Sequence, residues 1–316
     1  THRRQRQMCI RDRSKDDVRD AFAIADLLRT GKFTETQLLH GQYAELRQYA
    51  TRYERLRCDI VRQKNRLHSA VGQLFPELTR VFKDISGLTA IAMLRNHAAA
   101  VVIRDLSEED FVTAARADFE GQRIFVSKLR RAHSLAATSV GVQDGVQALQ
   151  LMVQQQLQTL ALLKGQWEET RKALVDAFLA LPESRYLLSV HGLGLVSAAI
   201  ILAEIGDPSH YHNGRQWIKL AGTQPMPNIS GRKTRSRTPI SRKGRPRLRT
   251  TLFFAVMRLV QVDDDFGRWY LHLQKREKNP LTKMQALGAL INKLLRILWA
   301  LVRNQTLYNP AFESAG

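Results

Sequence analysis

Apolar residues recur every seven positions along two long stretches of the chain, residues 39–74 and 146–181. This spacing is typical of long helices that pack against a partner along one seam. Pro76 and Pro182 follow the two stretches and are expected to end them. The pattern therefore predicts a helical coiled-coil arm over residues 35–182, in which a small helical insert separates two long helices.

Two helices of this kind form an antiparallel hairpin, and such arms commonly pair with a second copy of the chain. One expectation is therefore a homo-oligomer, either a dimer or a tetramer, and an intramolecular helical bundle explains the same pattern equally well. The polar face of the first helix could follow a phosphate backbone, although a solvated helix face is the commoner explanation. Its cationic residues are Arg52, Arg55, Arg62, Lys64 and Arg66.

Shorter apolar patterns flank the arm and also favour helices. Residues 14–34 begin with a helical pattern that Ser14 can cap, and residues 183–305 contain several helices. The last of these helices, over residues 284–302, has a continuous apolar face and is expected to lie in the core. Residues 1–13 show no periodicity and are expected to be foreign or disordered, and residues 306–316 form a tail. The fold class predicted is mainly α.

The bulk composition indicates an anionic partner. The chain of 316 residues carries 49 lysines and arginines against 29 acidic residues, a net charge of +20. This excess favours nucleic acid first and a membrane surface second. No apolar run approaches the ~20 residues that a spanning helix needs, and no signal peptide is visible, so no membrane partner is expected. Cys9 and Cys58 have neither metal-site nor disulfide spacing, which fits a cytoplasmic protein.

A glycine-containing turn follows the arm. Apolar residues flank His191, Gly192 and Gly194, and a run of small and apolar residues follows from Leu195. This arrangement predicts a helix-hairpin-helix motif, in which the glycines permit a tight turn and the next helix presents its backbone N–H groups to a phosphate. Such a contact positions nucleic acid without reading its sequence. His191 is expected to pack or cap within the turn.

A basic segment follows this turn, and Ser230 precedes it beside Gly231. A hydroxyl in a dense cationic setting can attack a phosphodiester, because the cations stabilise the charge that develops on the phosphate. Most serines next to glycine simply form turns, and a nuclear-localisation tract is the other explanation of the charge. The nucleic-acid-binding residues predicted in this segment are Arg232, Lys233, Arg235, Arg237, Arg242, Lys243, Arg245, Arg247 and Arg249.

Asp17 and Asp20 are three positions apart in the first predicted helix and therefore lie close together on its surface. Two neighbouring carboxylates can hold a hard cation such as Mg²⁺ through oxygen. Acidic residues in a first helical turn more commonly complement the helix dipole.

The order and spacing of several motifs resemble those of the DEDD transposases of the insertion-sequence-110 type. The resemblance covers residues 14 to about 304, and each motif alone is weak. The matching segments are KDDVRDA at 15–21, RQKNRLH at 62–68, VHGLGL to AEIGD at 190–207, AG at 221–222, SG at 230–231 and SRKGRPRLR at 241–249.

The resemblance implies an insertion-sequence recombinase that cuts and rejoins DNA. Such proteins combine an RNase H-like domain, whose four acidic residues bind Mg²⁺, with a coiled-coil arm and a helical transposase domain. Ser230 matches the catalytic serine that forms a phosphoserine intermediate, and Asp17 and Asp20 match the last two acids. The resemblance also implies multimers and a structured non-coding guide RNA.

The first two acids of the family precede the position of Asp17, and only residues 1–13 lie before Ser14. Residues 14–34 are therefore expected to be the carboxy-terminal remnant of an RNase H-like domain, and the chain is expected to be truncated and inactive by itself. The alternative is a non-enzymatic helix-hairpin-helix protein that binds DNA or RNA. A pure binder needs neither Ser230 nor the Asp17–Asp20 pair.

Overall fold

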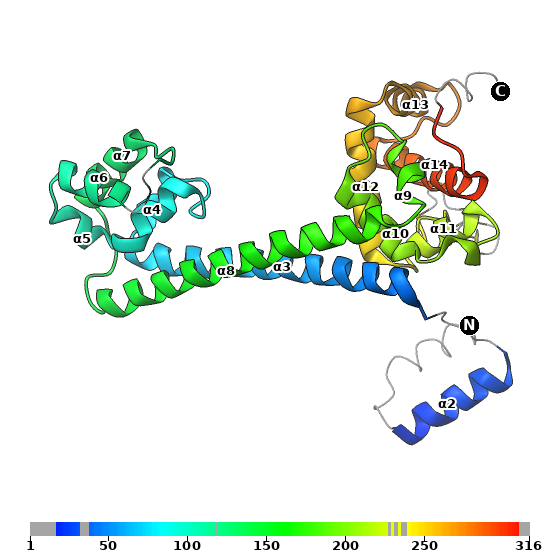
Figure 1. The fold of residues 1–316 in the computed structure, drawn as a ribbon, viewed down its shortest axis with the longest axis horizontal. Helices are drawn as coiled ribbons and strands as arrows, with labels where there is room; N and C mark the ends of the chain where they lie inside the picture. Colours follow the sequence, from blue (N-terminus) through cyan, green and yellow to red (C-terminus); the bar gives the residue numbers. More distant parts are fainter. Residues whose placement is uncertain are drawn as a thin grey trace. The chain divides into compact units, whose positions relative to one another are not determined.

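The computed structural model is mainly helical (Figure 1), as the sequence predicts. It divides into two compact units, residues 1–39 and 40–316. The residues it describes are 17–31, 38–117, 119, 121–226, 229–230, 233–234 and 239–309. The predictions for residues 1–13, for the Ser14 cap and for residues 310–316 of the tail lie outside the described residues.

The first unit contains one described helix, α2 (Asp17–Arg29). Asp17 and Asp20 lie in its first turn, and Arg29 forms an ion pair with Asp26 at 2.8 Å in its last turn. These charges complement the helix dipole at both ends. Every described side chain of α2 is exposed, including Phe22 on its apolar face. An RNase H-like origin for this segment stays a prediction.

Two helices, α3 (Gly41–Leu74) and α8 (Val146–Leu179), pack side by side over most of their lengths (Figure 1). The two helices run in opposite directions, because the insert between them reverses the direction of the chain. Tyr53 and Trp167, both at heptad positions, stack with ring centroids 5.2 Å apart. Trp167 is partly buried, whereas Tyr53 is buried, as are the heptad residues Leu46, Leu67, Leu74, Val153, Leu160, Leu174 and Leu181.

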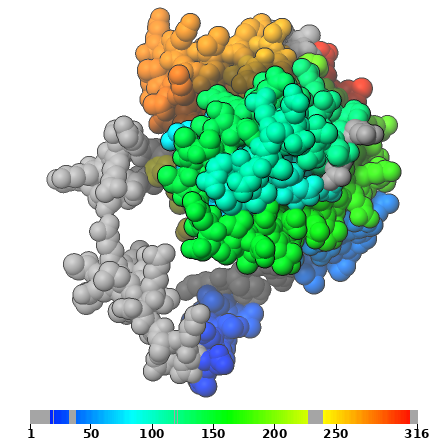
Figure 2. All heavy atoms as spheres, turned by 90° about the vertical axis from the view of Figure 1, so that its left-hand side faces the viewer, coloured from blue at the N-terminus to red at the C-terminus, as the bar shows by residue number. Residues whose placement is uncertain are grey.

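The far end of the arm carries a small helical insert with its own core. Phe111, Met93 and Leu129 are fully buried there, against residues of both arm helices. Figure 2 looks onto this end of the arm, where the insert and the nearby part of α8 (cyan to green) form one continuous surface. The insert contains η1 (Pro76–Arg80), α4 (Leu88–Asn96), α5 (Ala100–Arg104), α6 (Glu108–Ala117) and α7 (Val126–Ala136).

The other end of the arm joins a larger helical unit. Leu46 of α3 and Phe178 of α8 belong to its core, so the base of the arm is anchored by burial of apolar surface. Most of α10 is buried, which explains its nearly unbroken apolar sequence. The elements are α9 (Ser184–Leu188), α10 (Leu195–Ile205), η2 (Pro208–His210), α11 (Gly214–Ala221), β1 (Ile229–Ser230), β2 (Lys233–Thr234), α12 (Pro246–Val262), α13 (Asp264–Lys275) and α14 (Lys283–Asn304).

Among the described residues, α14 is the one helix long and apolar enough by composition to cross a membrane. Its packing is that of a core helix. Thr282 caps its first turn by accepting the N–H of Gln285, and Leu290, Leu294 and Leu298 are at most 1% exposed. The prediction that residues 284–302 form a core helix is therefore confirmed.

Candidate functional site

The glycine turn connects α9 to α10, as the sequence predicts. Gly192 has a φ of +87°, and a Cβ at this position would lie 2.4 Å from Val262 Cγ2. Glycine is therefore favoured at this position for both conformational and steric reasons. Gly194 has an ordinary φ of −70° with open space beside it, so the tight turn itself does not require glycine there.

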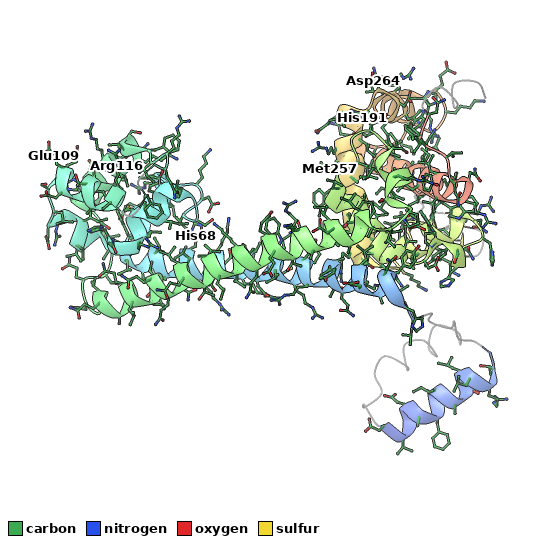
Figure 3. All side chains as sticks on the ribbon, viewed as in Figure 1. His68, Glu109, Arg116, His191, Met257 and Asp264 are labelled. Carbon is green, nitrogen blue, oxygen red and sulfur yellow. The ribbon has the colours of Figure 1, made fainter. Side chains whose placement is uncertain are left out.

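The start of α10 is open to the surface. Gly194 is its N-cap residue and supplies no side-chain hydrogen bond to the first turn. His191, Gly194 and Leu195 are exposed, and Figure 3 shows His191 at this turn. A helix N-terminus whose N–H groups are uncapped carries partial positive charge, which suits a phosphate oxygen. The turn therefore has the polarity that a backbone contact to nucleic acid requires.

The described residues between Gly222 and Arg245 pair as an antiparallel hairpin that starts and ends at the helical unit. Near its base, the N–H of Arg242 donates to Gly222 O and that of Ser241 donates to Gln224 O, both at 2.9 Å. Further out, β1 pairs with β2, with Ser230 opposite Lys233. The side chains of these two residues, and all of Gly231, Arg232, Arg235 and Arg237, lie outside the described part of the chain, so the predictions made for them stay predictions.

A buried hydrogen-bonded pair fixes the base of this hairpin to α14. The Thr223 hydroxyl donates to Asn292 Oδ1 at 2.6 Å, and Asn292 Nδ2 donates to the carbonyl oxygen of Thr223 at 3.3 Å. Thr223 is 1% exposed, so these polar groups satisfy each other away from water. Neither residue belongs to a recognisable sequence motif, and neither was predicted from the sequence.

The described cations of the basic segment divide into two groups. Arg242 and Lys243 are exposed and remain candidates for contact with nucleic acid. Arg245, Arg247 and Arg249 are partly buried and contact protein groups, with Arg249 Nη1 donating to Ala221 O at 3.0 Å. Their side chains therefore also hold the fold together, a role that the sequence pattern did not indicate.

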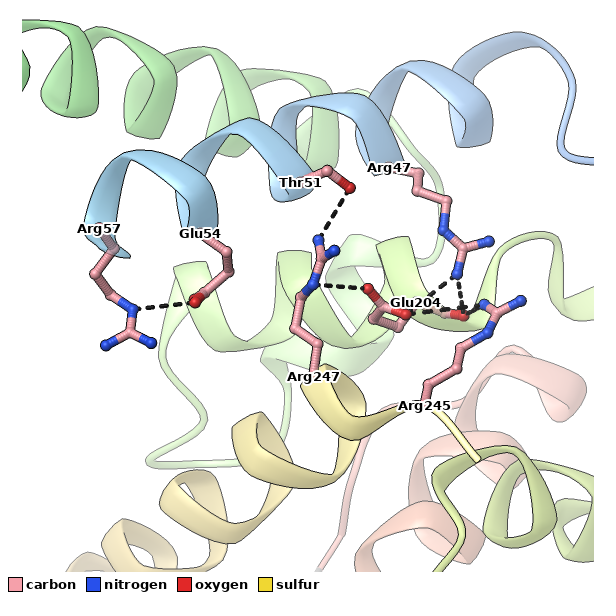
Figure 4. Close-up of polar contacts among 7 residues, drawn as sticks. All are labelled: Arg47, Thr51, Glu54, Arg57, Glu204, Arg245 and Arg247. Atoms are coloured by element: carbon pink, nitrogen blue, oxygen red, sulfur yellow. Dashed lines mark hydrogen bonds and ion pairs between the residues drawn. The ribbon is translucent and has the colours of Figure 1, made fainter. Parts of the chain in front are cut away.

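Glu204 is the centre of a charged cluster at the junction of α3, α10 and α12 (Figure 4). Its carboxylate accepts a hydrogen bond from Arg47 Nη2 at 3.1 Å and forms an ion pair with Arg247 Nε at 3.2 Å. Arg245 Nη1 donates to the carbonyl oxygen of Glu204 and lies 4.0 Å from Oε2. Arg247 Nη1 also donates to Thr51 Oγ1 at 3.0 Å. The cluster joins the arm to the residues that follow the Ser230 hairpin.

The Glu204 side chain is 5% exposed, whereas those of the three arginines are 27–30% exposed. Burial, followed by repulsion from Arg47, lowers the pKa of Arg245. A carboxylate in an apolar helix is tolerated only when cations compensate its charge. Arg47 and Glu204 were not predicted from the sequence, although a single acid within the apolar sequence of α10 is a usable signal for a buried ion pair.

The predicted metal ligands, Asp17 and Asp20, lie on one exposed turn of α2. Carboxylate oxygen suits a hard divalent cation, so the donor chemistry fits Mg²⁺. Within the described residues no group of three or more metal-ligating side chains is present. These two residues would therefore supply only part of a coordination shell.

Two segments of the chain match known protein families. The sequence profile of the transposase IS116/IS110/IS902 family matches residues 184–271, which include the glycine turn and the Ser230 hairpin. A second profile, for the DEDD transposase of the IS110 type, matches residues 1–76. The chain belongs to the IS116/IS110/IS902 family of transposases.

Similar proteins come from insertion elements of several bacteria. An IS116 protein of 44.8 kDa from Streptomyces clavuligerus is 25% identical over 94% of this chain and 73% of its own length. The transposase of IS1111A from Coxiella burnetii is 29% identical over 72% of the chain and 60% of its own length. The mini-circle putative transposase for IS117 from Streptomyces coelicolor is 31% identical over 70% of the chain and 55% of its own length.

Family membership decides the coarse function. The family is a class of insertion-sequence transposases and recombinases, which implies that DNA is a partner. The DEDD family also suggests a requirement for a divalent metal in general. The resemblance stated from the sequence motifs is therefore confirmed at the level of the family.

Proposed function

We propose that this transposase cuts and rejoins DNA through Ser230, together with an acidic Mg²⁺ site to which Asp17 and Asp20 contribute. One observation carries this proposal: the segment that matches the transposase family contains a backbone hairpin with Ser230 in its outer strands and exposed cations at its base. The family resemblance adds a non-coding guide RNA and a dimer or tetramer.

The chemistry is an exchange of one phosphodiester for another. The oxygen of the Ser230 hydroxyl forms a bond to phosphorus while the bond from phosphorus to a deoxyribose oxygen breaks. The serine proton passes to a base, and the departing oxygen takes up a proton. Reverse attack by a DNA hydroxyl rejoins the strand and frees the serine. The number of phosphoester bonds is unchanged, so no separate energy source is required.

The described residues assist this chemistry by positioning DNA. The uncapped start of α10 offers backbone N–H groups to a phosphate, in the manner of a helix-hairpin-helix. Arg242 and Lys243 add positive charge beside the hairpin. The paired helices α3 and α8 lie between the small helical insert and the helical unit that contains the glycine turn. Asp17 and Asp20 would hold the metal, which supplies positive charge to the reacting phosphate.

The decisive experiment is a search for a covalent protein–DNA adduct. The protein is incubated with nicked donor DNA, guide RNA and Mg²⁺, and adducts are separated under denaturing conditions. We expect Ser230→Ala to abolish the adduct and Ser236→Ala, in the same segment, to retain it. An adduct that survives Ser230→Ala would show that another residue is the nucleophile. Salt-sensitive binding without any adduct in the unsubstituted protein would favour the non-enzymatic binding protein.

A further inference from the structure

The cluster around Glu204 carries more positive charge than an internal ion pair needs. Three guanidinium groups face one carboxylate, which leaves two positive charges uncompensated in a partly buried setting. Coulomb repulsion between like charges is strong in such surroundings because water screens it poorly. A second anion would relieve the repulsion, so the cluster is preorganised to receive one.

The contacts within the cluster leave donors available. Arg47 uses Nη2 to reach Glu204, and Arg245 uses Nη1. A guanidinium has more N–H donors than these contacts occupy, arranged in a planar fork that matches phosphate oxygens. In Figure 4 the other terminal nitrogen of Arg47 and that of Arg245 point away from the Glu204 carboxylate. Both side chains are more than a quarter exposed, so an anion can reach them from solvent.

We propose that Arg47, Arg245 and Arg247, gathered on Glu204, bind a phosphate group of a nucleic-acid backbone where the arm meets the helical unit. This inference rests on the proposed function only in that nucleic acid is the partner. The exposed Lys243 lies two positions before Arg245 on the returning strand of the hairpin, so one nucleic-acid strand can meet both. The bound phosphodiester belongs to either DNA or the guide RNA.

The same arm helix supplies an internal comparison. Arg57 Nε contacts Glu54 Oε2 at 3.0 Å, so one cation faces one carboxylate (Figure 4). The Arg57 side chain is 54% exposed. This pair is electrically neutral and gains nothing from a second anion, apart from the weak attraction of any surface cation. Arg57→Gln is therefore the matched control for Arg47→Gln.

The test measures binding in the Ser230→Ala background and without Mg²⁺, so that the nucleophile assignment cannot affect it. Dissociation constants are measured against salt concentration for a random-sequence DNA duplex and for the guide RNA. We expect Arg47→Gln to reduce the salt slope by about 1 for at least one probe, as the loss of one phosphate contact should. Arg57→Gln should leave both slopes unchanged. The probe that responds identifies the strand that is bound.

Arg47→Gln leaves Glu204 with two guanidinium partners, so the fold should persist, and thermal unfolding of the variant checks this. A second measurement needs no substitution. Phenylglyoxal modifies accessible arginines, and mass spectrometry locates the adducts. We expect nucleic acid to protect Arg47 more than Arg57. Equal protection of the two residues, or equal salt slopes for the two variants, would overturn the proposal and leave the cluster as an internal clamp.

Discussion

The backbones of Gly222 and Gly244 are in direct contact at the base of the Ser230 hairpin. A Cβ on Gly244 would lie 2.5 Å from the nitrogen of Gly222 and 2.5 Å from Leu220 O, closer than real Cβ atoms approach. Gly222 has a φ of +68°, in the left-handed region that favours glycine. The two glycines therefore let both strands leave the helical unit as a narrow stem.

Gly244→Ala should displace this stem. The added methyl group must push the strands apart, because the atoms it meets are backbone atoms. We expect the yield of the serine–DNA adduct to fall on the order of 100-fold, since a displacement of about 1 Å is enough to misalign a nucleophile. Adduct yield and the far-ultraviolet circular dichroism spectrum are measured together, and the helical signal should be retained.

Gly288→Ala is the control for this substitution, because a Cβ at Gly288 of α14 would meet no atom within 4 Å. It should stabilise the protein by roughly 0.5–1 kcal/mol through the higher helix propensity of alanine. An adduct yield for Gly244→Ala equal to that of Gly288→Ala would show that the stem does not position Ser230.

Thr223→Val should destabilise the protein although it keeps the shape of the side chain. The substitution leaves Asn292 Oδ1 without its 2.6 Å donor in a buried setting, which costs about 1–3 kcal/mol. Urea unfolding of Thr223→Val, Asn292→Leu and the double variant measures the coupling between the two residues. Strictly additive free energies would contradict a direct interaction.

The arm was predictable from sequence because its seam repeats. The apolar positions over residues 39–74 and 146–181 became two helices whose bounds differ from the prediction by only a few residues. The short helices of the insert lack such a repeat, because each contributes only a few residues to a shared core. The bounds of these short helices therefore depend on tertiary packing, which cannot be predicted from the local sequence.

The candidate site was predictable only where the signal is local. The glycine turn and the basic segment are each continuous in sequence, so a local pattern is enough to propose them. Glu204 and Arg47 are separated by 157 positions and meet only because α3 packs against α10. The same contact explains why Arg245 and Arg247, which sequence alone assigns to nucleic acid, also have a protein partner.

Asp84 should make stability depend on pH. The pKa of Asp84 is lowered to about 2, chiefly because the Ser86 hydroxyl donates to its carboxylate, and the Ser86 N–H and Lys64 add to the effect. The folded-state pKa lies below the ordinary value, so the ionised carboxylate stabilises the protein above about pH 4. This contribution is lost as the pH falls from about 4 to about 2.

Urea unfolding of the unsubstituted protein and Asp84→Asn should therefore differ most at neutral pH and converge as the pH falls toward about 2. Asp105→Asn is the control, because its carboxylate is 70% exposed and lies 3.7 Å from Arg104. A difference between the unsubstituted protein and Asp84→Asn that stays constant with pH would contradict the role assigned to the charge.

Substitutions at Gly192 and Gly194 should distinguish the contribution of the turn to stability from its contribution to nucleic-acid binding. Gly192→Ala should weaken both, because alanine is strained at a φ of +87° and its Cβ would meet Val262. Two measurements check this variant: the free energy of unfolding of the protein, and its dissociation constant for a DNA duplex at one salt concentration. Stability and binding should fall together.

Gly194→Asp should instead have opposite effects on stability and binding. A carboxylate at the N-cap accepts the N–H groups of α10, which stabilises the helix by a few tenths of a kcal/mol relative to glycine. The same carboxylate occupies the position where a phosphate would bind, and its negative charge repels the phosphate. Binding to the DNA duplex should therefore fall. Gly194→Ala is the uncharged control and should bind nearly as well as the unsubstituted protein. Unchanged binding by Gly194→Asp would show that the start of α10 does not meet a phosphate.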